Sequence, residues 1–314
     1  MTTASYPSIS LRTGLAVTAA VALTAASAGA ATAQGESERS VVATTEVLGS
    51  IVSQVVGEAA EVTVIMPSGA NPHSYEASAR DAERILGADV VVSNGLELEE
   101  ALVSVLESAE DEGVTWFRAA EHITLRALEG DHADEDDDHP DEHEHGLEDP
   151  HIWTDPVAMA DVVAALQPVL TEAGLDVADT ADALLADLAA LDDEVVAILA
   201  DIPAESRKLV TGHRSLGYFA DRYGFEQVGT VIPSISTSGE PTARELSELI
   251  EAIRDNGVPV VFTEVGTPES VARAVADDSG AQLVPLSASQ LPEGGTYQDL
   301  IRDIASTVDR ALAG

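Results

Sequence analysis

The sequence predicts an α/β fold with two three-layer α/β lobes, each built on a parallel-type sheet, joined by one long rigid helix. Short β-branched segments alternate with longer helical patterns in two sets, and such alternation is typical of parallel sheets covered by helices. A stretch without glycine or proline, residues 175–202, separates the two sets and ends at Pro203. The predicted organisation is an N-terminal lobe over residues 40–174, a linker helix over 175–202 and a C-terminal lobe over 203–314.

Each set contains four candidate strands and the helical patterns between them. In the first set the apolar segments predict strands at residues 41–45, 61–66, 89–93 and 114–119, and helices at 47–56 and 79–86. In the second set they predict strands at residues 208–211, 227–232, 259–264 and 282–286, and helices at 214–223, 243–256, 270–279 and 298–312.

The linker helix is predicted from apolar residues that recur at spacings of three and four, as in an amphipathic helix. These residues are Leu184, Leu185, Leu188, Leu191, Val195, Val196 and Leu199. A continuous helix over 175–202 would be about 40 Å long at about 1.5 Å per residue, which is enough to brace both lobes. The alternative is an ordinary surface helix of the first lobe, but the absence of a helix breaker before Pro203 favours the brace.

Charge and composition exclude several classes of partner. The formal net charge is −41, and Lys208 is the single lysine. Nucleic acids and anionic membranes both require a basic surface, so neither is expected as a partner. The chain has no cysteine, so any metal must be held by His, Asp, Glu or water.

The N-terminus resembles a signal peptide over residues 1–33. Arg12 precedes an apolar segment, residues 14–30, and Ala31-Thr32-Ala33 supplies the small residues of a cleavage site. A membrane anchor is the alternative, but the segment ends in small residues rather than in basic ones. We therefore expect an exported protein, in a periplasm or at the extracellular face of the cytoplasmic membrane, without a lipid anchor on cysteine.

Three histidines in separate contexts are the candidate metal ligands. They are His73 in Asn-Pro-His, His151 in Asp-Pro-His and His213 in Thr-Gly-His. Any one of them alone is more often an ordinary polar or core histidine, but three imidazoles with an open fourth position make a zinc-like site. Ligands bind open α/β sheets at the carboxyl ends of strands. We therefore expect the metal in a cleft between the lobes, with two histidines from the first lobe and His213 from the second.

Residues 40–314 resemble the solute-binding proteins of zinc and manganese ABC transporters. The segments that carry the resemblance are Asn71-Pro72-His73-Ser74-Tyr75-Glu76, Asn94-Gly95-Leu96-Glu97-Leu98-Glu99, Asp149-Pro150-His151-Ile152-Trp153, Thr211-Gly212-His213, Tyr218-Phe219, Tyr223-Gly224, Glu240-Pro241 and Phe262-Thr263-Glu264. The resemblance implies two α/β lobes joined by a long rigid helix, and it implies that His73, His151 and His213 are metal ligands. A histidine at the third position implies the zinc type, with Mn²⁺ as the alternative ligand.

An acidic segment, residues 129–149, precedes the second histidine context and carries twelve carboxylates. It resembles the mobile histidine-rich loop of zinc-type members. Its side chains are expected to collect zinc weakly and pass it to the cleft. The alternative is an inert solvated linker, because acidic runs usually face water. The histidines concerned are His132, His139, His143 and His145.

The sequence does not identify the fourth metal ligand. The family usually supplies an aspartate after the last strand, but here that loop, residues 286–291, contains no carboxylate, and Ser287 stands near the expected position. The remaining candidates are water, Glu264, Glu240 or a residue of the acidic segment.

The predicted function is an extracytoplasmic, high-affinity zinc-binding protein that delivers Zn²⁺ to an ABC-transporter permease. A manganese-selective member of the same family is the alternative. A second, weaker alternative is a zinc-dependent hydrolase with Glu76 as general base. The sequence contains no HExxH motif, which is the zinc-binding helix of many such enzymes. An adhesin is a third alternative, but it would need an anchor to the membrane or wall. A lipid anchor on cysteine is not expected, because the sequence contains no cysteine. We expect no enzymatic activity, a monomer, and a metallochaperone as a further partner.

Overall fold

The structure is a computed structural model that describes residues 39–127 and 148–313. The predicted signal peptide and the four histidines of the acidic segment lie outside the described residues. Within the described residues, no helix combines the length and the apolar character needed to cross a membrane.

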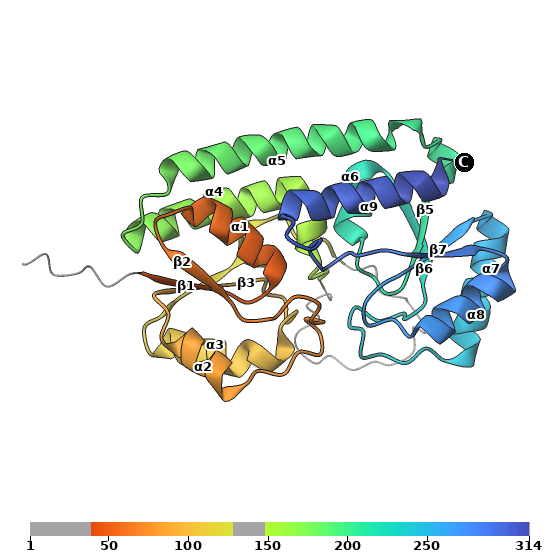
Figure 1. The fold of residues 1–314 in the computed structure, drawn as a ribbon. Coiled ribbons are helices and arrows are strands. Elements are labelled where there is room, and N and C mark those ends of the chain that lie inside the picture. The colour runs from red at the N-terminus through yellow and green to blue at the C-terminus, as the bar shows by residue number, and fades with distance from the viewer. Residues whose placement is uncertain (1–38, 128–147, 314) are drawn as a thin grey trace, which may run out of the picture. The chain divides into compact units, whose positions relative to one another are not determined.

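The N-terminal lobe contains a four-stranded parallel sheet in the order β2-β1-β3-β4 (Figure 1). Alternate residues of its central strands belong to two different apolar clusters, one on each face. Val41 and Val90 pack with helix α1, whereas Val42 and Val91 pack with residues of α2 and α3. The predicted three layers follow from this alternation. The elements are β1 (Ser40–Ala43), α1 (Glu46–Val56), β2 (Glu61–Val64), α2 (Ala79–Leu86), β3 (Val90–Ser93), α3 (Val103–Asp111) and β4 (Thr115–Arg118).

The C-terminal lobe contains two parallel strand pairs, β5-β6 and β7-β8, and β5 lies next to β7. All four strands were predicted, but they form two hydrogen-bonded pairs rather than one ladder. Helices α7 and α8 pack on them at the right of Figure 1. The elements are β5 (Lys208–Thr211), α6 (Gly217–Tyr223), β6 (Glu226–Thr230), α7 (Ala243–Asn256), β7 (Val260–Thr263), α8 (Glu269–Ser279) and β8 (Gln282–Pro285).

The predicted linker helix is α5 (Ala178–Ile198), which continues as a 3₁₀ turn over Leu199–Asp201. At 21 residues it is about 30 Å long, shorter than the sequence predicted. The side chains that it buries recur at spacings of three and four, as expected: Ala181, Leu184, Leu188, Leu191 and Val195. Figure 1 shows α5 running alongside both lobes.

Two helices were not predicted, α3 and α4 (Pro156–Glu172). Helix α4 contains an internal proline, Pro168, and its apolar residues do not form a narrow stripe, so its pattern resembles no amphipathic helix. It packs against α5. The five 3₁₀ turns of the described residues are Glu100–Leu102, Ala119–His122, Ile152–Thr154, Leu199–Asp201 and Ala204–Ser206.

The C-terminal helix α9 (Tyr297–Leu312) returns to the N-terminal lobe and packs on α5 (Figure 1). The Tyr297 hydroxyl donates a hydrogen bond to the carbonyl oxygen of Trp153, and the Tyr297 backbone N–H donates to Ser50 Oγ in α1. One apolar cluster includes residues of both lobes and of α4, α5 and α9. Sliding one lobe on the other would expose this shared core, so the lobes are firmly joined. The lobe boundaries at 174 and 203 stay a prediction.

Candidate metal centre

The structure brings His73, His151 and His213 together. The Nε2 atom of His151 lies 3.2 Å from that of His73 and 3.2 Å from that of His213. His73 lies in the loop after β2, His151 directly before the 3₁₀ turn Ile152–Thr154, and His213 in the loop after β5. His151 and His213 are buried, whereas His73 is half-buried.

These separations match a tetrahedral metal site. Two Zn–N bonds of about 2.0–2.1 Å at the tetrahedral angle place their nitrogens about 3.3–3.4 Å apart. All three ligand atoms lie within 4.8 Å of one another, and the described residues contain no other group of three or more His, Cys, Asp or Glu side chains with this property. The three side chains therefore have the geometry to hold one ion, although their role as ligands stays a prediction.

The His73 and His151 loops share one local structure. In each, an Asx residue two positions before the histidine accepts a hydrogen bond from the histidine's backbone N–H, across an intervening proline. The N···O distance is 3.1 Å for Asn71 Oδ1. It is 3.0 Å for Asp149 Oδ1. Such Asx turns fix the backbone locally, so the sequence Asx-Pro-His presents the imidazole in a defined direction.

Asp149 also selects which ring nitrogen of His151 faces the other two histidines. The same Oδ1 atom lies 2.8 Å from His151 Nδ1, and the carboxylate is fully buried. Arg126 Nη1 lies 3.4 Å from Asp149 Oδ2 and balances its charge. Because a carboxylate accepts hydrogen bonds, Nδ1 carries the proton and Nε2 presents its lone pair. The Nε2 lone pair faces the two neighbouring imidazoles.

Glu264 occupies the corresponding position behind His213, but less closely. Its Oε2 lies 3.5 Å from His213 Nδ1, which is within ion-pair distance but is not a formed hydrogen bond. Ser215 Oγ donates to Glu264 Oε1 at 2.7 Å. Burial raises the pKa of Glu264 to about 7. The Glu264–His213 contact, at 3.5 Å, is therefore longer and weaker than the Asp149–His151 contact at 2.8 Å.

Burial favours the neutral form of two of the imidazoles, those of His73 and His213. It lowers the pKa of His73 to about 3, with a smaller contribution from the His151 ring. It also lowers the pKa of His213 well below its usual value. Neutral imidazoles are the form that binds metal, so little proton competition is expected near neutral pH.

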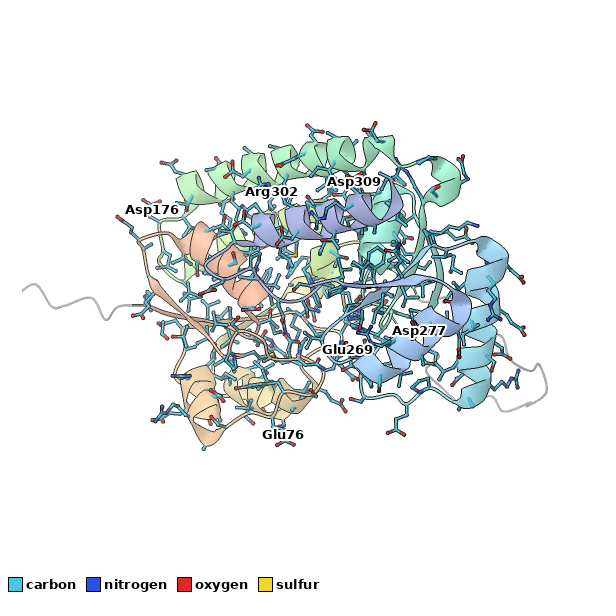
Figure 2. The ribbon with its side chains drawn as sticks, turned by 45° about the vertical axis from the view of Figure 1, so that its right-hand side comes forward. Glu76, Asp176, Glu269, Asp277, Arg302 and Asp309 are labelled. Carbon is cyan, nitrogen blue, oxygen red and sulfur yellow. The ribbon has the colours of Figure 1, made fainter. Side chains whose placement is uncertain are left out.

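None of the predicted fourth ligands among the described residues joins the three nitrogens. Glu264 lies on the far side of the His213 ring, and Glu240 is exposed. Ser287 is also exposed, and its hydroxyl donates to the carbonyl oxygen of Gln290 within its own turn. Glu76, the base that a hydrolase would need, is exposed and points outward (Figure 2). The described carboxylates thus leave the fourth position to water or to a residue outside the described part.

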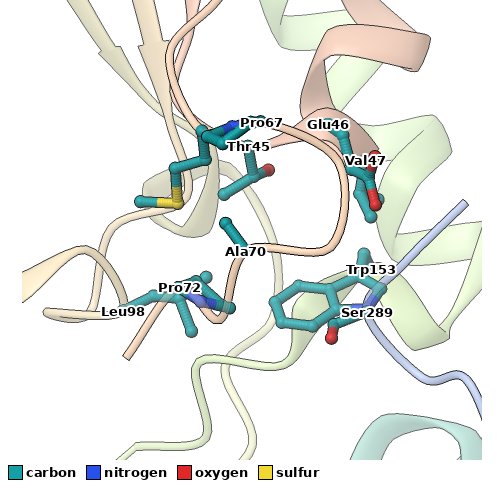
Figure 3. A pocket seen from close by; sticks show the side chains of 10 residues that line it. Thr45, Glu46, Val47, Pro67, Ala70, Pro72, Leu98, Trp153 and Ser289 are labelled. Carbon is teal, nitrogen blue, oxygen red and sulfur yellow. The ribbon is translucent and has the colours of Figure 1, made fainter. Parts of the chain in front are cut away.

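A small cavity lies beside the His73 loop, and Figure 3 shows Pro72, Trp153 and Ser289 among its lining residues. Its volume of about 20 Å³ admits roughly one water molecule. Trp153 Nε1 donates to the carbonyl oxygen of Ala288, and the Trp153 ring centroid lies 5.3 Å from that of His151. The 286–291 loop therefore contacts Trp153 through the Ala288 carbonyl group, and its Ser289, not Ser287, lines the cavity.

Three positioning residues were not identified from the sequence: Asp149, Asn71 and Asn94. Asn94 Nδ2 donates to the carbonyl oxygen of Pro150 at 2.8 Å and so holds the segment before His151. The signal was present, because all three belong to the segments that carry the family resemblance. Their roles depend on contacts between distant segments, which the sequence does not reveal.

A two-lobed α/β fold braced by one long helix, with clustered imidazoles between the lobes, defines the class of metal-binding solute-binding proteins of ABC transporters. Residues 41–311 match the family described as zinc-uptake complex component A, periplasmic. The chain belongs to this family, and the resemblance noted in the sequence is confirmed.

The relatives differ in the metal they are named for. The manganese-binding lipoprotein MntA of Halalkalibacterium halodurans is 30% identical over 93% of this chain and 96% of its own length. The zinc-binding lipoprotein AdcA of Streptococcus pneumoniae is 28% identical over 79% of this chain, a match that spans 50% of AdcA. The periplasmic zinc-binding protein TroA of Treponema pallidum has a similar structure, with a TM-score of 0.76 and 25% identity over 88% of this chain and 100% of TroA.

Proposed function

We propose that this protein captures Zn²⁺ outside the cytoplasm and delivers it to the membrane permease of an ABC transporter. The observation that carries the proposal is the cluster of three imidazoles in which His151 Nε2 lies at a zinc-like distance from the Nε2 atoms of both His73 and His213. Imidazole nitrogens favour zinc, whereas manganese prefers more oxygen donors. No described carboxylate oxygen completes the cluster, which supports zinc over manganese.

Manganese is the second candidate ligand. It is favoured by the relative named as a manganese-binding lipoprotein, which matches this chain over nearly its whole length. An oxygen donor from outside the described residues would bring the site closer to what manganese requires.

Metal competition tests the choice. Protein lacking residues 1–33, stripped of metal, should bind about one zinc tightly and should release bound manganese when one equivalent of zinc is added. The zinc and manganese that stay bound after gel filtration are measured by mass spectrometry. Retention of manganese against equimolar zinc would contradict the zinc assignment, and binding of neither metal would contradict the site.

The remaining parts of the proposal follow from the family and from the charge. We propose an exported monomer that docks with the permease, receives zinc from a metallochaperone where one is present, and binds no nucleic acid. We also propose that it has no enzymatic role, which is supported by the outward direction of Glu76, the base expected of a hydrolase. Turnover of ester or peptide substrates by the zinc-loaded protein would refute this part, and light scattering would test the monomer.

The acidic segment is proposed to collect zinc for the cleft. Deleting residues 131–145 should leave the tight site intact but slow zinc loading at limiting concentrations, since the deletion removes the four imidazoles of the segment that precedes His151 in the sequence. Stopped-flow loading from a buffered zinc pool measures this rate. An unchanged rate would indicate an inert linker. Loss of tight zinc would instead mean that the segment supplies the fourth ligand.

A further inference from the structure

The loop that carries His73 is weakly tied to the C-terminal lobe. Its residues 67–69 are exposed, and His73 is the least buried of the three histidines. Among the described residues, one side-chain hydrogen bond other than the histidine contacts joins residues 67–78 to the C-terminal lobe. Asn71 Nδ2 donates it to Thr237 Oγ1 at 2.8 Å.

The orientation of the Asn71 amide is fixed by its other contact. The His73 backbone N–H is only a donor, so the Asn71 atom that it meets at 3.1 Å must be the oxygen. The amide nitrogen is then left to donate to Thr237. A single side chain thus connects the backbone of His73 to the loop after β6, in the other lobe.

Two further loops of the C-terminal lobe pack closely against this hydrogen bond or connect it to the metal site. Gly266, in the loop after β7, has a φ of +89°, and a Cβ there would lie 2.7 Å from Asn71 Nδ2 and 2.8 Å from Thr237 Cβ. The backbone N–H of Ile232 donates to the carbonyl oxygen of Gly212 at 2.8 Å, which ties the Thr237 loop to the residue before His213. The bond therefore joins the His73 loop to a segment that is itself hydrogen-bonded to the residue before His213.

We propose that the Asn71–Thr237 hydrogen bond is a latch that holds His73 in the closed site and limits the rate at which the metal leaves. The inference rests on the proposed metal site. His151 and His213 lie in buried segments, so the half-buried His73 loop is the part that can move at least cost, and moving it breaks the latch. Asn71 acts as a positioning residue, through His73.

The latch predicts a specific change in kinetics for Thr237→Val, which keeps the side-chain shape and removes the acceptor. Zinc release into a chromogenic chelator should become roughly three- to tenfold faster, the range expected for one net hydrogen bond. The association rate should stay within about twofold, because the substitution changes none of the three imidazoles and no charge at the site. Stopped-flow absorbance on the zinc-loaded protein measures both rates.

Two matched variants make the test specific. Thr237→Ser keeps a hydroxyl and should release zinc at the wild-type rate. Thr230→Val removes a hydroxyl of similar burial in the same lobe, whose hydrogen bond goes to the carbonyl oxygen of Ile232, and should also leave release unchanged. Wild-type release from Thr237→Val, equally fast release from Thr237→Ser, or equally fast release from Thr230→Val would each overturn the latch. A wild-type protein that binds no zinc would overturn the proposed site and the latch with it.

Discussion

Zinc affinity should fall by more than about 100-fold when His151 is replaced by alanine. The Nε2 atom of His151 lies 3.2 Å from both other imidazoles, so its loss leaves two nitrogens, too few for a tetrahedral site. Removing a residue that only hydrogen-bonds to a metal ligand typically lowers metal affinity by about 10–100-fold. Removing the ligand itself should lower the affinity by more. Titration of the metal-free variant against a competing chelator measures the affinity.

The matched control is His122→Ala. His122 is exposed and stacks on Phe117, with ring centroids 4.5 Å apart, and it takes no part in the histidine cluster. This variant should bind zinc as the wild type does. If His151→Ala retained stoichiometric tight zinc, the assignment of the cluster as the site would be wrong.

Replacing Asp149 by asparagine should weaken zinc binding by about 10–100-fold without removing a ligand. The asparagine oxygen still accepts the hydrogen bond from His151 Nδ1, but the negative charge that supports a metal-bound imidazole is lost. Arg126 also loses its buried anionic partner, so some loss of stability is expected. Affinity is measured by the same chelator competition, after circular dichroism has established that the variant is folded.

Glu264→Gln is the comparison that isolates the contact. Glu264 is also a buried carboxylate next to a cluster histidine, but its 3.5 Å separation from His213 Nδ1 is not a formed hydrogen bond. Its replacement should weaken zinc by less than about tenfold. Equal losses in the two variants would show that burial of charge, and not the hydrogen bond to Nδ1, accounts for the effect of Asp149.

The elements that the sequence predicted well are those with strong local signals. All eight predicted strands are present, and each end lies within two residues of its predicted position, because β-branched runs bounded by turn residues identify buried parallel strands. Helix α4 was missed because it is apolar around much of its surface and contains Pro168, so no periodic stripe marks it. Helix α5 proved shorter than predicted, since the absence of a helix breaker does not by itself define where a helix begins.

The histidines of the site were identifiable from short contexts, whereas their partners were not. Asp149 stands two residues from His151, and the turn that it forms is a local property. That its carboxylate is buried beside Arg126 depends on how segments 23 residues apart fold together. Glu264 was predicted as a possible ligand because a carboxylate near a metal site is chemically plausible. Its position behind His213 depends on how the loops after β5 and β7 meet.

The sequence alone determined the α/β class, the two sets of strands, the bracing helix and three histidines with the chemistry of metal ligands. These follow from local periodicity and from side-chain chemistry, which a sequence states directly. Only the tertiary structure decided that His151 Nε2 lies 3.2 Å from the Nε2 atoms of both His73 and His213, that Ser287 bonds within its own turn, and that Asn71 reaches Thr237 across 166 residues of chain. Such contacts form where separate elements pack, and the free energy that selects them belongs to the whole core rather than to any one segment.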